Sequence, residues 1–184
     1  MNGYILKFGQ QNNMTNLITY SDFSGTINID TSRVEVKEVI AEYITEYQEK
    51  FLIKLLGISL YNDLLSYDVT SDKYKDLING ISSTFNWDNK NRRYIGVKRM
   101  LACFIYPYYV RESISGNALF AEVQPNPSNG SIVENRMKFV HAYNEAVKLY
   151  TDAIIFIQYK NQNDSSYYAN FKPEVLKPLN SWGL

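Results

Sequence analysis

Residues 32–64 read SRVEVKEVIAEYITEYQEKFLIKLLGISLYNDL, and this stretch decides what kind of fold the chain can adopt. Ser32 and Glu35 have the spacing of a capping box, in which each side chain accepts a hydrogen bond from the backbone of the other residue. Apolar residues then recur at steps of three and four, the spacing of one buried helical face. Gly57 suits the left-handed conformation that ends a helix. The stretch therefore predicts a helix over 33–56 and a shorter one over 58–67.

Five glutamates follow the first of these predicted helices at steps of three or four residues, so they share one face. With one lysine among them, residues 35–49 carry a local net charge of −4. A solvated helix face is one interpretation. The other is a surface that contacts a neighbouring copy or lines a passage for DNA, where carboxylates would repel phosphates. The acidic stripe consists of Glu35, Glu38, Glu42, Glu46 and Glu49.

The remainder of the chain predicts more helices and little else. A short helix begins at Thr70 or Ser71 and stops at Gly80, and residues 81–92 are predicted to form a polar loop. A helix over 93–114 is apolar almost all round, which is typical of a central helix. After a long loop over 115–131, a second capping box begins the last helix, over 132–160. We therefore expect an all-α bundle of four to five helices, with one long inter-helix loop and extended N- and C-terminal arms.

Three regions follow from this pattern: an N-terminal arm over 1–30, a helical domain over 31–160 and a C-terminal interaction arm over 161–184. The last region holds aromatic residues but too few apolar residues at helical spacing to pack as a helix. Exposed aromatic side chains would form adhesive patches, so we expect them to dock on an adjacent subunit or ring. The alternative is that this tail folds back on its own bundle. The predicted aromatic anchors are Tyr167, Tyr168, Phe171 and Trp182.

Basic residues gather between positions 88 and 111, where six of them face one aspartate and give a local net charge of +5. This segment is a second candidate for contact between copies, and within it we single out Arg92, Arg93 and Arg99 as interface residues. The net charge of the whole chain is zero, whereas dedicated nucleic-acid binders are usually strongly basic. DNA binding by sequence is therefore not expected.

Catalytic motifs are not recognisable in this chain of 184 residues. It has no glycine-rich phosphate loop, no nucleophile elbow and no Cys-x-x-Cys pair. The single histidine, His141, lies off the apolar stripe of its helix, and the single cysteine, Cys103, lies in the most apolar helix, where a buried, inert thiol is expected. Asp68, Asp72 and Asp76 have the spacing of one helix face, yet a helix start explains them better than a cation does. We predict no enzyme, no cofactor and no metal.

The order of these features resembles the helical head–tail connector (neck adaptor) proteins of tailed bacteriophages, particularly those of Bacteroidetes phages and prophages. The resemblance covers residues from about 29 to 184 and rests on the order and spacing of features. Its first part comprises Ile29-Asp30 and the run YQEKFLIKLLGISLY at 47–61. Its second part comprises Tyr94-Ile95-Gly96 before the Tyr-rich helix, the loop over 115–131, the last long helix and the ending NSWGL at 180–184.

The resemblance implies a structural protein of the virion that forms a ring, expected to be a dodecamer, between the portal and the tail. Its partners would be further copies of itself, the portal protein and other neck or tail proteins. DNA would pass through the ring without sequence-specific binding. The protein would be made in the host cytoplasm and would reside in the virion neck. No apolar run reaches 18 residues, so no membrane partner is expected. The alternative is a monomeric helical protein-interaction module of phage or host.

Overall fold

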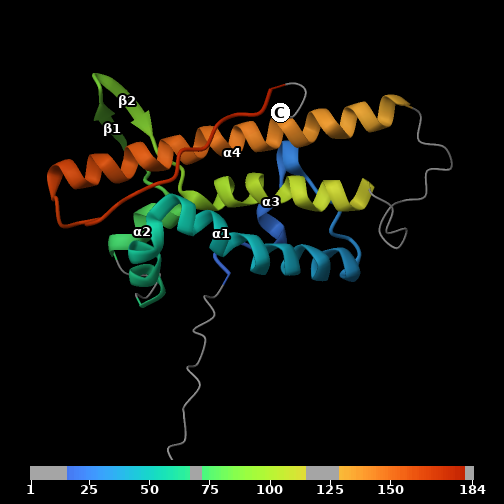
Figure 1. The fold of residues 1–184 in the computed structure, drawn as a ribbon, viewed down its shortest axis with the longest axis horizontal. Helices are drawn as coiled ribbons and strands as arrows, with labels where there is room; N and C mark the ends of the chain where they lie inside the picture. The colour runs from blue at the N-terminus through green and yellow to red at the C-terminus, as the bar shows by residue number, and fades with distance from the viewer. Residues whose placement is uncertain (1–15, 67–71, 115–128, 181–184) are drawn as a thin grey trace, which may run out of the picture.

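The computed structural model describes residues 16–66, 72–114 and 129–180. Within these residues the protein is mostly helical, with one small sheet, so the helical part of the prediction is confirmed but the expected all-α bundle is not. Helix α3 (Val97–Ile114) lies between α1 (Val34–Ser66) and α4 (Asn129–Asn163), and the short α2 (Asp72–Asn79) packs against one end of this layered arrangement (Figure 1).

Helix α1 has the interruption that the sequence predicts. Gly57 adopts a φ of 74° and a ψ of 161°, which separates the helix into two parts close to the predicted boundary. The core side of the longer part is built from residues four apart, such as Ile40 and Ile44, which are fully buried. The ring of Phe51 stacks on that of Phe104 in α3 at 4.2 Å between centroids, which joins α1 to the central helix.

Residues 84–93 form a β-hairpin where a polar loop is expected, which is a correction to the predicted fold. Strand β1 (Thr84–Trp87) pairs antiparallel with β2 (Lys90–Arg93), and Trp87 lies opposite Lys90. Asp88 and Asn89 make the two-residue turn with φ values of 51° and 56°, the conformation that a tight hairpin requires. Phe85 is buried against Tyr159 of α4, with ring centroids 4.7 Å apart, so the hairpin is anchored to the helical layers.

The described part of the predicted N-terminal arm, residues 16–30, packs into the core instead of extending from it. It contains two 3₁₀ turns, Tyr20–Asp22 and Gly25–Ile27, and buries apolar residues that include Ile18 and Phe23. The backbone N–H of Leu17 donates to Oε1 of Gln48, a buried polar side chain of α1, at 2.7 Å. The segment is therefore part of the folded domain.

The C-terminal tail folds back along α4. After α4 ends at Asn163, a turn over residues 165–170 reverses the chain, and residues 171–180 run back beside the helix in an extended conformation (Figure 1). We call residues 171–180 the strap. The predicted long loop over 115–131 lies almost entirely outside the described residues, and α4 begins at Asn129, slightly before its predicted start.

Candidate interaction surfaces

The acidic stripe is an exposed face of α1. All five glutamates are exposed, while the apolar residues between them, such as Ile40 and Ile44, are buried. Glu46 accepts a hydrogen bond from Nζ of Lys50 at 2.9 Å, and this bond lowers the pKa of the Glu46 carboxyl. Lys50 also lies 4.4 Å from the centre of the Tyr47 ring. Ion pairs at such exposed positions contribute little to stability, so the stripe remains a surface of net negative charge.

The three predicted interface arginines do not form one surface. Arg99 points into its own chain, where its guanidinium donates to the Ser24 carbonyl at 2.8 Å and to the Thr26 hydroxyl at 3.2 Å. Arg99 therefore holds the N-terminal segment against α3, and its expected role at an interface stays a prediction. Arg93, at the end of β2, is exposed.

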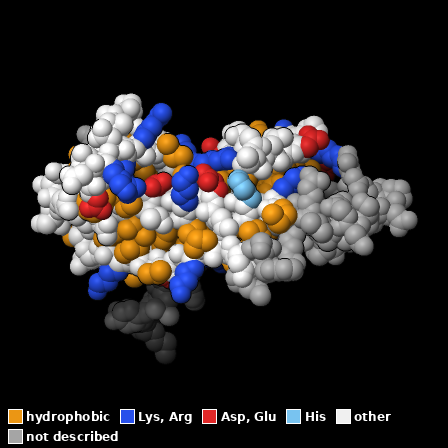
Figure 2. Space-filling model, turned by 90° about the horizontal axis from the view of Figure 1, so that it is seen from above, with side chains coloured by type: hydrophobic (Ala, Val, Ile, Leu, Met, Phe, Trp, Pro, Cys, Tyr) orange, Lys and Arg blue, Asp and Glu red, His pale blue; other side chains and the backbone are white. Residues whose placement is uncertain are grey.

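Arg92 connects the hairpin to α4. Its Nη1 lies 3.8 Å from a carboxylate oxygen of Asp152. Burial raises the pKa of the Asp152 carboxyl, although the positive charge of Arg92 opposes the shift. The face that carries α4 and the hairpin shows Lys, Arg, Asp and Glu side chains interspersed (Figure 2). On this face the basic residues therefore do not gather into a single area.

The acidic stripe and the basic hairpin lie at different edges of the molecule. Helix α1 runs along the lower side in Figure 1, and the hairpin of β1 and β2 projects at the upper left.

Tyr168 does not have the exposure that a partner contact needs. Its side chain is completely buried, and its hydroxyl donates to the Lys73 carbonyl of α2 at 2.6 Å. The amide of Asn161 in α4 holds its backbone through two hydrogen bonds, of 2.8 and 3.2 Å. Tyr167 and Phe171 are half-buried against the same core, and Trp182 lies outside the described residues. These contacts favour the alternative that the tail folds back on its own bundle.

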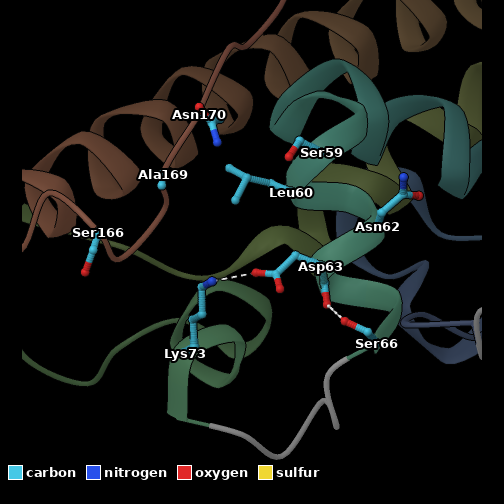
Figure 3. Close-up of a pocket in the computed structure, with 9 residues that line it drawn as sticks. All are labelled: Ser59, Leu60, Asn62, Asp63, Ser66, Lys73, Ser166, Ala169 and Asn170. Atoms are coloured by element: carbon cyan, nitrogen blue, oxygen red, sulfur yellow. Dashed lines mark hydrogen bonds and ion pairs between the residues drawn. The ribbon is translucent and has the colours of Figure 1, made fainter.

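An open polar pocket of about 450 Å³ lies between the second part of α1, the start of α2 and the turn before the strap (Figure 3). Asp63 is its charged centre and accepts hydrogen bonds from Lys73 at 2.5 Å and from the Tyr74 hydroxyl at 2.7 Å. Burial raises the pKa of the Asp63 carboxyl, but the two hydrogen bonds outweigh it and the net pKa is lowered. The carboxylate is therefore occupied in holding α2 to α1. The other lining residues are Ser59, Leu60, Asn62, Ser66, Ser166, Ala169 and Asn170.

The candidate reactive groups are placed as follows. Cys103 is buried in α3, and burial raises the pKa of its thiol to about 11. His141 is exposed on α4. Asp76 accepts a hydrogen bond from Lys160 at 2.9 Å, while Asp68 lies outside the described residues. Over residues 16–66, 72–114 and 129–180, no cluster of three or more His, Cys, Asp or Glu residues is arranged to hold a metal ion. Over the same ranges, no helix has the length and apolarity to cross a membrane.

Comparisons of this chain with models of known protein families, with curated protein sequences and with solved structures find no match.

Proposed function

We propose that this protein is a structural component that assembles into a ring in the neck of a tailed bacteriophage, between the portal and the tail. The observation that best supports the proposal is the acidic stripe, because five exposed carboxylates on one long helix form a continuous charged line. The resemblance of residues from about 29 to 184 to neck adaptors supplies the biological setting. In this setting the protein catalyses no reaction and needs no cofactor or metal.

The placement of charged residues supports contact between copies. The acidic stripe on α1 and the exposed Lys90 and Arg93 of β2 lie at different edges of one chain, so the stripe of one copy can face these two residues of the next. Repetition of such a head-to-tail contact closes a ring when the rotation between copies permits closure. Charge complementarity would orient neighbouring copies during assembly.

Neutralisation of the stripe tests this assembly. We expect the triple variant E38Q/E42Q/E46Q to remain folded, because exposed substitutions usually change stability by less than about 0.5 kcal/mol each. Its oligomer should weaken, as should that of K90Q/R93Q on the hairpin, and size-exclusion chromatography with light scattering measures both. The double variant K75Q/K148Q is the matched control, because these two exposed lysines lie on α2 and α4, outside both surfaces.

Two other outcomes would change the assignment. An unchanged oligomer that now retains DNA would place the stripe on the channel wall, where carboxylates keep phosphates from binding. An unchanged oligomer with unchanged DNA retention would reduce the stripe to a solvated helix face.

A monomeric helical interaction module is the second candidate, and a specific observation favours it. The described parts of both predicted arms complete the core of their own chain, as the burial of Ile18 and Tyr168 illustrates. A protein that remains monomeric over the whole concentration range in the same measurement would support this second candidate.

A further inference from the structure

Hydrogen bonds to its backbone hold the strap against Lys54 of α1 and against Asn144 and Tyr150 of α4, and we call the surface formed by these three residues the groove. Asn144 of α4 binds Leu179 twice: its Nδ2 donates to the Leu179 carbonyl at 2.9 Å, and its Oδ1 accepts from the Leu179 N–H at 2.7 Å. In the middle of the strap, the N–H of Glu174 donates to the Lys54 carbonyl at 2.8 Å. The Tyr150 hydroxyl lies 2.6 Å from the Lys54 carbonyl and 2.9 Å from the Glu174 carbonyl, so its single proton is shared between the two. These contacts make the groove a site for an extended peptide.

The side chains of the strap are at most half-buried, and among them Phe171 and Leu176 pack against the core. Across residues 171–180 no side chain is fully buried, and Val175 is 86% exposed. The ion pair between Lys54 and Glu174 spans 2.6 Å, but the two side chains are 38% and 56% exposed, so water screens the attraction. Pro173 and Pro178 restrict the backbone to extended conformations. The two prolines therefore favour the extended conformation that the strap has in this chain.

A hinge separates the strap from the buried part of the tail. Tyr168 is fixed in the core, whereas Ala169 and Asn170 directly after it are exposed. Asn170 has a φ of 64°, in the left-handed region that few non-glycine residues adopt. A change of conformation at these two residues redirects the strap and leaves the contacts of Tyr168 intact.

We infer that the strap is an exchange segment, and that in the assembled protein it lies in the groove between α1 and α4 of a neighbouring copy. The occupant is an identical peptide, so every hydrogen bond to Asn144, Lys54 and Tyr150 is formed again between chains. In a separate chain the short tether gives its own strap a local concentration of the order of millimolar, which favours the folded-back form. The inference rests on the proposed function, because a ring holds the neighbour's groove at a similar local concentration.

Zero-length cross-linking of the full-length protein tests the exchange. Equal amounts of unlabelled and ¹⁵N-labelled chain are mixed as monomers and concentrated until the oligomer forms, and carbodiimide then links Lys54 to Glu174. Mass spectrometry of the linked peptides distinguishes links within one chain from links between two chains. The internal control is the Lys160–Asp76 pair, which joins two core helices of one chain at 2.9 Å. The variant E174Q removes the carboxylate and should abolish the Lys54 link.

With complete exchange, about half of the Lys54–Glu174 links should join a labelled to an unlabelled peptide, while the Lys160–Asp76 links should all be uniform in label. An oligomer with only uniform Lys54–Glu174 links would overturn the exchange and leave the ring proposal standing. Mixed links in a species of only two chains would support the exchange and contradict the ring. Chains that stay monomeric and form only uniform links would overturn both.

Discussion

Tyrosine hydroxyls connect segments that are distant in the sequence to helices α1 and α2, and each does so by donating to a backbone carbonyl. Tyr94 donates to Leu77 of α2 at 2.8 Å, Tyr150 to Lys54 of α1 at 2.6 Å, and Tyr168 to Lys73 of α2 at 2.6 Å. A buried hydroxyl needs such a partner, because an unpaired polar group inside a protein is costly. These three tyrosines thus serve as internal connections of the fold.

Gly96 lies where its backbone passes close to that of residues 78–80. Its φ is 86°, and a Cβ atom there would lie 2.4 Å from the Ile78 carbonyl oxygen and 2.7 Å from the backbone of Gly80. We expect Gly96→Ala to lower the free energy of unfolding by about 1–2 kcal/mol, because alanine is strained in the left-handed conformation. Overpacking by the added methyl group should lower it by about 1–3 kcal/mol more. The control Gly25→Ala, with a φ of 65° and open space around its Cβ, should show only the first loss. Equal losses for the two variants in urea unfolding would contradict this account.

Cys103 should resist alkylation in the folded protein. Burial in α3 raises the pKa of its thiol from 9.0 to about 11, so at pH 8 the group is protonated and enclosed. Iodoacetamide should label it completely in urea and only slowly without urea. The raised pKa also means that the unfolded chain loses this proton first as the pH rises. The thiol's contribution to stability is therefore intact below pH 9 and is lost between pH 9 and about 11. Rapid labelling of the native protein would show that α3 opens readily.

Among the elements, the tail combines a core residue with an exposed strap. Substitutions in the two parts should therefore differ sharply in their effect on the free energy of unfolding. Tyr168→Ala removes a fully buried ring and its hydrogen bond to Lys73, so we expect a loss of about 3–5 kcal/mol in the free energy of unfolding. Val175→Ala, in the exposed strap, should change it by less than about 0.5 kcal/mol. Chemical denaturation measures both values. A small loss of unfolding free energy for Tyr168→Ala would indicate that the tail is an independent arm and not part of the core.

The sequence predicts a helix well where apolar residues keep one helical spacing over many residues. The steps of three and four in residues 34–56 and the glycine at 57 place α1 and its interruption correctly. Polar residues around Phe85 and Trp87 obscure the short alternation of β1, although the Asp88-Asn89 pair is a recognisable hairpin turn. Tyr168 illustrates the other limit: an extended segment can bury one ring with no periodic pattern, so counting helical positions underestimates its contacts.

At the scale of the whole molecule, the low helical periodicity of the sequence at both ends predicts two extended arms. The structure shows that segments without periodicity can still complete a core, as residues 16–30 and the turn at 165–170 do. The exposure of the acidic stripe, in contrast, could be predicted, because it depends only on spacing along a single helix. The proposed contact between copies would depend on the shape of the surfaces, which no local sequence pattern encodes.

Negative-stain electron microscopy of the purified protein, alone and with a phage portal, can reveal the proposed neck ring. Class averages should show a closed, symmetric ring, expected to contain twelve copies, that stacks on the portal around a common channel. Particles of monomer size in both samples, at every concentration tested, would contradict the proposed ring.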